Sequence, residues 1–247
     1  MKILMLHGYA QNSNTFRLKL RRLEEAIVRA YPGTEFVYTD GPIRLSPSDV
    51  PGFEPTPTQR HGEDSEGPEL RAWFQLRYVL DPPAGLSRSL NELAELLDRF
   101  GPFDGIVAFS QGTVVAAMLA SLLQGDLRRE AYVKALGSSS HIMPYPKAFL
   151  ELRHPPLKFA VLYAGRVGRA RYYDWMYEAP GIGTPFCHFV GLWDPVVEHE
   201  ERDAVLGKLA GSGSSGVVVV HAGGHFVPTD GENVGRVVDF IGECVGP

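Results

Sequence analysis

The sequence predicts an α/β fold in which a mostly parallel central sheet carries helices on both faces. Apolar runs recur along the chain and are near-continuous, as expected of strands that are buried on both faces of a parallel sheet. Helical patterns lie between these runs, so strands and helices alternate. The 247 residues are enough for one domain with a sizeable core, and we expect a single domain over 1–247. The predicted strands are residues 2–7, 34–40, 104–109, 157–165, 185–193 and 216–223.

The helices between these strands are predicted from apolar spacing and from end signals. Residues 18–31 form an amphipathic helix, because leucine and isoleucine recur on one face. Residues 86–100 form the next helix, which begins at Ser87 or Ser89 as its N-cap and stops at Gly101-Pro102. The remaining helices are predicted at 114–123 and 233–244.

Two stretches interrupt this alternation. Pro, Gly, Ser and charged residues dominate 43–68, which is therefore predicted to be a loop insertion, either a flap at the site entrance or simply an exposed loop. The stretch 138–182 contains an aromatic-rich part just before the strand at 185–193, where caps over a site often enter. It is a candidate cap segment.

Composition and charge exclude several classes of function. The net charge is −5 and the Lys and Arg residues are scattered, so the chain lacks the basic stripe of nucleic-acid-binding proteins. Cys187 and Cys244 could form at most one disulfide, and no Cys/His cluster has metal-ligand spacing. Neither a Walker-type loop nor a GxGxxG after a strand is present. We therefore expect no metal, no cofactor and no nucleic-acid partner.

The distribution of apolar residues also predicts the location of the protein. No stretch approaches the roughly 18 consecutive apolar residues that a membrane-spanning helix needs. The apolar N-terminal run ends at His7-Gly8, too early for the apolar region of a signal peptide. We expect a cytoplasmic protein without a membrane span.

Ser110 is the candidate nucleophile, because it lies at the corner between a predicted strand and a predicted helix. In the surrounding AFSQG, Ala108 and Gly112 are small residues two positions on either side of the serine. Small flanks permit the strained turn that lifts a nucleophilic serine out of a sheet, for which the usual pattern is G-x-S-x-G. Ala108 replaces the first glycine, which is acceptable if that position needs a small residue rather than a positive φ. A serine that only caps the helix would fit the same pentapeptide, but the strand–helix context favours a nucleophile.

A serine nucleophile needs an imidazole that takes its proton and an acid that orients the imidazole. Asp194 follows one predicted strand and His225 follows the last, which gives the order nucleophile, acid, base at strand ends. His221 is the competing base, but it lies at the end of the valine run, where the pleat fixes its side chain. His188 precedes the acid within its own strand. We therefore favour Ser110, Asp194 and His225 as the catalytic residues.

Acyl transfer also needs hydrogen-bond donors for the developing oxyanion. One is the backbone N–H after the nucleophile, here that of Gln111, and another comes from the loop after the first strand. In that loop Gly8 permits a turn and Tyr9 presents its amide. Tyr9 and Gln111 are the predicted oxyanion-hole residues.

Six motifs of the chain resemble those of the FSH family of serine hydrolases: LHGYAQN, DGP, RAWF, GPFDGIVAFSQG, GLWDPVV and HAGGHFVP. The resemblance spans nearly the whole chain and is weakest at 43–68 and 138–182. It implies an α/β-hydrolase fold and assigns the same catalytic and oxyanion residues. Fungal members of the family are often esterases or thioesterases that act in trans on polyketide synthases. The resemblance therefore also implies an acyl substrate delivered by an acyl carrier protein.

Aromatic residues near these motifs are candidates for a substrate pocket, because ligand sites are mostly apolar. Ordinary core packing explains aromatic side chains equally well, and the sequence leaves both explanations open. The candidates are Trp73, Phe74, Tyr173, Trp175 and Phe226.

These residues together favour hydrolysis of a carboxylic ester or thioester through an acyl-enzyme on Ser110. The acyl group, and whether it arrives on a small molecule or on a carrier protein, has no local signature in the sequence. One alternative is a carboxylesterase, lipase-like or acyltransferase activity on small esters. Another is a hydrolase-fold protein that binds a ligand without turnover, because a fold does not determine a function.

Overall fold

A six-stranded parallel sheet forms the centre of the computed structural model, which describes residues 1–50, 69–75, 85–139, 141–166, 171–178, 181–197, 203, 207 and 216–246. The strands are β1 Lys2–Leu6, β2 Glu35–Thr39, β5 Gly105–Phe109, β6 Phe159–Tyr163, β7 Phe186–Gly191 and β8 Gly216–His221. Their order in the sheet is β2-β1-β5-β6-β7-β8, and every neighbouring pair is parallel. The predicted α/β fold with a parallel central sheet is confirmed.

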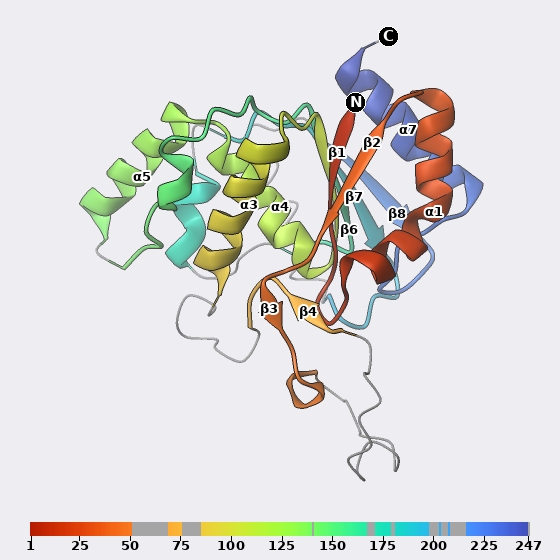
Figure 1. Ribbon diagram of the computed structural model, residues 1–247, viewed down its shortest axis with the longest axis horizontal. Coiled ribbons are helices and arrows are strands. Elements are labelled where there is room, and N and C mark those ends of the chain that lie inside the picture. The colour runs from red at the N-terminus through yellow and green to blue at the C-terminus, as the bar shows by residue number, and fades with distance from the viewer. Residues whose placement is uncertain are drawn as a thin grey trace.

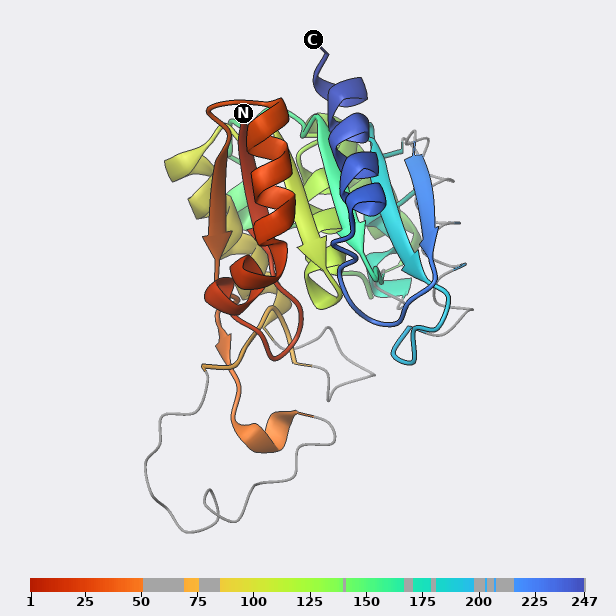
Figure 2. The same ribbon diagram turned by 90° about the vertical axis from the view of Figure 1, so that its right-hand side faces the viewer.

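Helices cover both faces of the sheet (Figure 1, Figure 2). Side chains alternate along each strand, so that in β1 Ile3 and Met5 pack on one face while Leu4 and Leu6 pack on the other. The first face is covered by α1 and α7, and the second by α3 and α4. The helices are α1 Ser13–Ala30, α3 Leu86–Phe100, α4 Gln111–Leu122, α5 Asp126–Ser138 and α7 Gly231–Val245.

The start of α1 is fixed by a side-chain N-cap, whereas the start of α3 is not. α1 begins after Asn12, whose side chain accepts a hydrogen bond from the N–H of Thr15 at 2.8 Å. α3 begins after Gly85, so the predicted serine cap of this helix is wrong. Ser89 lies inside α3. Its hydroxyl donates a hydrogen bond to the carbonyl oxygen of Trp73, in a segment outside the helix, and so does not cap α3.

The start of the predicted loop insertion is an ordered hairpin. β3 Ile43–Arg44 pairs antiparallel with β4 Arg71–Ala72, and Gln11 bridges to β4. The short helix η1 Pro47–Asp49 follows β3, and its last carbonyl oxygen accepts a hydrogen bond from the Tyr9 hydroxyl at 2.9 Å. Residues 51–68 of the insertion lie outside the described residues. The described part therefore packs against the loop that follows β1.

The candidate cap segment 138–182 includes β6 of the central sheet and the short helices η2 Lys147–Phe149 and η3 Arg171–Met176. η3 packs against α4 and α5. The guanidinium of Arg128 in α5 is buried and donates hydrogen bonds to the carbonyl oxygens of Trp175 at 2.8 Å and Glu178 at 3.0 Å. Within this segment β6 contributes to the core on both faces of the sheet, and η3 packs on the α3–α4 side.

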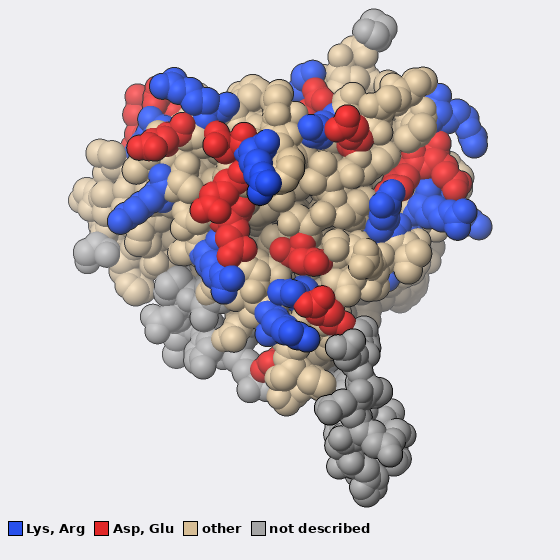
Figure 3. Space-filling view, viewed as in Figure 1, with Lys and Arg blue, Asp and Glu red and all other residues tan. Residues whose placement is uncertain are grey.

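The surface mixes charges of both signs on the face shown in Figure 3. Along α1 and α3, ion pairs one helical turn apart join Arg21 to Glu25 and Arg88 to Glu92. Of the helices that the structure describes, none is long and apolar enough to cross a membrane.

Candidate active site

Ser110 stands at the turn between β5 and α4 in a backbone conformation that few residues adopt. Its φ is 49° and its ψ is −116°, a strained combination that costs a residue other than glycine about 1–3 kcal/mol. The Ser110 N–H donates to the carbonyl oxygen of Tyr163 at 2.9 Å, and its carbonyl oxygen accepts from the Thr113 hydroxyl at 2.6 Å. These bonds hold the turn that presents the Ser110 hydroxyl at the carboxyl edge of the sheet.

The two small residues around Ser110 are required to different degrees. A β-carbon on Gly112 would lie 2.6 Å from the carbonyl oxygens of both Leu6 and His7, so only glycine fits between α4 and the end of β1. Ala108 lies buried within β5, where an extended backbone needs no positive φ. Alanine can therefore occupy the position where the usual pattern has glycine.

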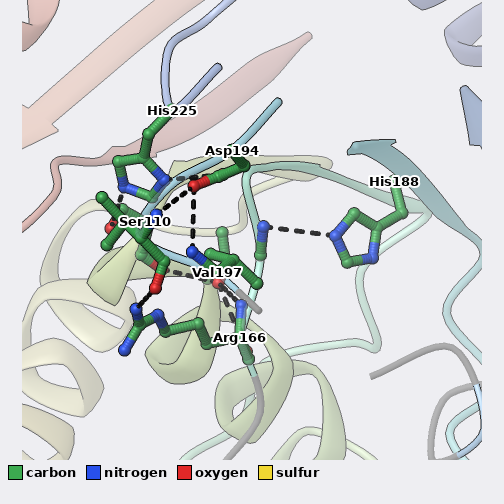
Figure 4. Close-up of polar contacts among 9 residues, drawn as sticks. Ser110, Arg166, His188, Asp194, Val197 and His225 are labelled. Carbon is green, nitrogen blue, oxygen red and sulfur yellow. Dashed lines mark hydrogen bonds and ion pairs between the residues drawn. The ribbon is translucent and has the colours of Figure 1, made fainter. Parts of the chain in front are cut away.

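Ser110, His225 and Asp194 meet at the carboxyl ends of β5, β8 and β7 (Figure 4). His225 Nε2 lies 2.8 Å from Ser110 Oγ, and His225 Nδ1 lies 2.8 Å from Asp194 Oδ2. Because a carboxylate only accepts hydrogen bonds, Nδ1 carries the proton and the lone pair of Nε2 faces the Ser110 hydroxyl. The ring of Phe109 packs against the imidazole with 5.0 Å between ring centroids. The structure thus brings together the three residues that the sequence selects.

The loop after β7, residues 192–197, is fixed by hydrogen bonds around Asp194. The carboxylate oxygen that does not face His225 accepts from the N–H groups of Val196 at 2.8 Å and Val197 at 2.9 Å. The guanidinium of Arg166, in the loop after β6, donates to the carbonyl oxygen of Val196. Both oxygens of Asp194 therefore have partners, and the carboxylate cannot turn without losing them.

Glycines let the loops after β7 and β8 touch each other. A β-carbon on Gly191 would lie 2.5 Å from the carbonyl oxygen of Gly224, and the N–H of Trp193 donates to the carbonyl oxygen of Gly223 at 2.9 Å. The loops after β7 and β8 therefore run in contact, which places His225 beside Asp194.

Two other histidines near the site are unsuited to act as the base. His221 ends β8, where its ring packs 5.3 Å from that of Phe226, and burial lowers its pKa. His188 lies within β7 and accepts a hydrogen bond from the N–H of Gly165 at 3.2 Å (Figure 4). Burial lowers the pKa of His188 to about 4, which keeps this imidazole neutral near pH 7. It lines a cavity together with Asp194 but is not bonded to Ser110.

The two predicted oxyanion residues flank Ser110. Gln111 is the first residue of α4, directly after the serine. Tyr9 follows Gly8 in the loop after β1, and β1 pairs with β5. A β-carbon on Gly8 would lie 3.3 Å from Ser110 Cβ and 2.8 Å from a ring carbon of Phe109. The loop that carries Tyr9 therefore passes directly against Ser110.

His7 has a place in this region that the sequence pattern did not reveal. Its Nδ1 lies 2.7 Å from the carbonyl oxygen of Gly8, and its Nε2 accepts a hydrogen bond from the N–H of Gly41 at 2.9 Å. A neutral ring with its proton on Nδ1 satisfies both contacts, and burial lowers the pKa of His7, which favours that form. His7 thus ties the loop that carries Tyr9 to Gly41, two residues before the insertion. A histidine directly before the glycine that ends the strand is the signal that could have indicated it.

The predicted pocket residues are mostly enclosed. Trp73 and Trp175 are each 1% exposed, and Tyr173 and Phe74 are also buried. Trp175 packs against the rings of Tyr132 and Tyr145 at 5.1 and 5.7 Å, in the core beside α5. Phe226, next to His225, is 49% exposed and is the one of the five that presents substantial surface.

The thiols and carboxylates of the described residues offer no metal site, because no group of three or more His, Cys, Asp or Glu side chains is suitably arranged. Cys187 and Cys244 are free thiols. Burial raises the pKa of Cys187 to about 12, so this thiol stays protonated and unreactive.

A parallel sheet in this order, with a serine at the strand–helix turn bonded to a histidine, defines a serine hydrolase of the α/β-hydrolase fold. The chain belongs to the FSH1 family of serine hydrolases, since the model described as "Serine hydrolase (FSH1)" matches residues 1–237.

Two curated relatives differ in how much of their length this chain covers. Esterase OVCA2 of Danio rerio is 27% identical over 98% of this chain and 96% of its own length. An uncharacterized hydrolase of Schizosaccharomyces pombe is 29% identical over 97% of this chain but 50% of its own length. The chain therefore spans about half of the Schizosaccharomyces pombe relative and nearly all of the Danio rerio esterase.

Solved structures with the same fold share little sequence identity with this chain. SOBER1 of Arabidopsis thaliana superposes with a TM-score of 0.61 at 14% identity, over 100% of this chain and 99% of that one. Acyl-protein thioesterase 2 of Zea mays gives a TM-score of 0.59 at 19% identity, over 99% and 94% of the two chains. At these identities the likeness concerns the fold alone.

Proposed function

We propose that this serine hydrolase cleaves a carboxylic ester or thioester through an acyl-enzyme formed on Ser110. The observation that carries the proposal is the pair of 2.8 Å contacts that join Ser110 Oγ to His225 and His225 to Asp194. This arrangement suits a nucleophile, a general base and an orienting acid. The membership of the chain in a serine hydrolase family supports the same chemistry.

In the acylation step, His225 Nε2 takes the hydroxyl proton of Ser110 as Oγ attacks the carbonyl carbon of the substrate. The carbonyl oxygen becomes an oxyanion that accepts hydrogen bonds from the N–H groups of Tyr9 and Gln111. Asp194 accepts from Nδ1–H and stabilises the imidazolium. When the tetrahedral intermediate collapses, the bond to the leaving alkoxide or thiolate breaks, and His225 gives its proton to the leaving group.

In the deacylation step, a water molecule replaces the leaving group in the same site. His225 takes a proton from this water, whose oxygen attacks the acyl carbon. The ester bond to Ser110 Oγ then breaks, the serine recovers its proton from His225, and the carboxylic acid leaves. An alcohol in the place of water would give acyl transfer instead of hydrolysis.

The proposed substrate has an apolar acyl group. Exposed apolar side chains lie on the loops that carry the acid and the base, namely Leu192, Trp193, Val196 and Phe226. Apolar surface beside reacting groups is typical of sites that bind acyl chains. The family resemblance implies that such an acyl group is carried by an acyl carrier protein. We therefore propose a polyketide acyl chain, bound to a carrier protein as a thioester, as one substrate to test.

The test is a panel of p-nitrophenyl esters and acyl thioesters of rising chain length, with wild type and Ser110→Ala. We expect wild type to turn over members of the panel and Ser110→Ala to lose turnover. A preference for thioesters, increased further when a carrier protein bears the acyl group, would favour carrier-protein release. A preference for free esters would favour a carboxylesterase or lipase-like enzyme.

A fluorophosphonate probe separates an enzyme from a protein that only binds a ligand. The probe phosphonylates a serine only when a base activates it, so we expect wild type to be labelled at Ser110 and His225→Ala to be labelled far more slowly. A wild-type chain that takes no label and cleaves no member of the panel would overturn the proposal.

A further inference from the structure

The side chain of Gln111 bonds to a segment distant in the sequence, residues 71–74, which we call the strap. Gln111 Oε1 accepts a hydrogen bond from the N–H of Trp73 at 2.8 Å, and Gln111 Nε2 donates to the carbonyl oxygen of Phe74 at 2.7 Å. The carboxamide thus bonds to one backbone donor and one backbone acceptor of the strap. Gln111 is buried, so water does not compete for these bonds.

Trp73 joins the strap to the loop after β1. Its indole Nε1–H donates to the carbonyl oxygen of His7 at 2.8 Å, and the two rings lie 5.1 Å apart. The carbonyl oxygen of Trp73 accepts from the Ser89 hydroxyl, which anchors the strap to α3. Each polar group of Trp73 therefore has a partner, and the whole residue is buried.

These bonds link the two backbone donors of the proposed oxyanion hole. One donor, the N–H of Gln111, starts α4, and the other, the N–H of Tyr9, lies two residues after His7. Trp73 holds the Gln111 side chain through its backbone N–H and the His7 carbonyl through its indole N–H. Trp73 therefore connects Gln111, whose N–H is one proposed donor, to the loop after β1, where the N–H of Tyr9 is the other.

We infer that Trp73 and the Gln111 carboxamide are positioning residues that set the separation between the two oxyanion donors. The inference rests on the proposed function. Neither group touches the reacting atoms in this scheme; each fixes a backbone N–H that does. The oxyanion exists only after attack on the carbonyl, so misplaced donors weaken the transition state and leave ground-state binding nearly unchanged.

The decisive variant is Trp73→Phe, which keeps an aromatic ring but removes the indole N–H that bonds His7, together with part of the buried ring system. A misplacement of about 1 Å costs up to roughly a hundredfold in rate, and full loss of one oxyanion donor about a hundredfold to a thousandfold. We expect kcat on a p-nitrophenyl ester to fall about tenfold to a hundredfold with KM nearly unchanged. Gln111→Met, which removes both carboxamide bonds, is expected to act in the same direction.

The matched control is Thr184→Val, which also removes a buried donor to a backbone carbonyl without changing the shape of the side chain. The Thr184 hydroxyl donates to the carbonyl oxygen of Leu157 at 3.1 Å, near the amino ends of β6 and β7, away from the site. We expect this variant to keep kcat. Trp73→Phe also leaves a void in the core, so its melting temperature should fall further than that of Thr184→Val.

Two further measurements separate positioning from a general structural role. An alkyl trifluoromethyl ketone forms a tetrahedral adduct on a catalytic serine, so its inhibition constant should rise in Trp73→Phe by the same factor by which kcat/KM falls. The pH midpoint of kcat/KM should not move, because Ser110, His225 and Asp194 are untouched.

The outcomes distinguish this inference from the proposed function. An active wild type whose Trp73→Phe variant keeps kcat and the inhibition constant within twofold would overturn the inference alone. Equal losses of kcat in Trp73→Phe and Thr184→Val would overturn it as well. A wild type without esterase activity or probe labelling would overturn the proposed function and this inference with it.

Discussion

The carbonyl oxygen of His7 lies 2.6 Å from the point where a β-carbon on Gly112 would stand. The first turn of α4 therefore touches the loop after β1 with no space for a methyl group. Because Ser110 caps that helix, Gln111 starts it and Tyr9 lies two residues after His7, the proposed nucleophile and the proposed oxyanion donors form one packed unit.

Gly112→Ala should push this unit apart. Overpacking at a tight contact costs about 1–3 kcal/mol of unfolding free energy, and we expect at least a tenfold loss of kcat as the loop moves away from Ser110. Urea unfolding and ester turnover measure both effects. Gly137→Ala in α5 is the matched control, because its added methyl group meets no described atom within 4 Å beyond the local backbone of its own helix. Equal stability and activity of the two variants would contradict the prediction.

Ser110→Gly should be more stable than Ser110→Ala, although both are expected to be inactive. Glycine adopts the backbone angles found at Ser110 without strain, whereas alanine keeps the strain and loses only the hydroxyl. The expected difference in unfolding free energy is about 1–2 kcal/mol. Chemical denaturation of the two variants side by side provides the measurement, and equal midpoints would show that the turn stores no strain.

Asp194→Asn should abolish most activity with little effect on the fold. The amide oxygen can still accept from Val196 and Val197, but the amide NH₂ then faces His225 Nδ1 and favours the tautomer with its proton on Nε2. That tautomer cannot accept the Ser110 proton, so we expect kcat to fall by about four orders of magnitude. Steady-state kinetics with circular dichroism as the control for folding checks this. Activity within tenfold of wild type would exclude Asp194 as the orienting acid.

Stability should fall in mild acid because of His188. Burial lowers the pKa of His188 to about 4, from an ordinary value of 6.5, so between these values the unfolded chain binds more protons than the folded one. The stability present above about pH 6.5 is lost as the pH falls toward 4, by up to about 3 kcal/mol. His188→Gln does not titrate and should lose less unfolding free energy between about pH 7.5 and about pH 5. Parallel losses in wild type and variant would count against this assignment.

The sheet and the three residues of the proposed triad could be predicted because their signals are local. Each residue follows an apolar run, and parallel strands bring their carboxyl ends to one edge. Ser110, Asp194 and His225 were therefore expected at one edge of the sheet, and the strand order, with β6 between β5 and β7, is seen only in the structure. His225 was separable from His221 because two glycines precede it and allow its loop to reach Asp194.

The partners of Gln111 and Trp73 could not be predicted, because nothing in the local sequence links residues 38 positions apart. The same holds for Ser89, which looks like a helix cap but bonds to Trp73. Trp175 illustrates a different limit. An aromatic residue near a site has the same sequence pattern whether it lines a pocket or packs in the core, and contacts with Tyr132 and Tyr145 are visible only in three dimensions.

The pairing of β7 with β8 places Gly191 opposite His221 and so fixes where both following loops start. A slip of one residue would move the base loop by about 3.3 Å along the sheet and turn every β8 side chain to the other face. The reactivity of Ser110 therefore reports whether β8 is paired with β7 in the native register. During refolding, Ser110 should become susceptible to a phosphonylating reagent only after the edge strand β8 has reached its native alignment. The time course of labelling would therefore measure when β8 docks.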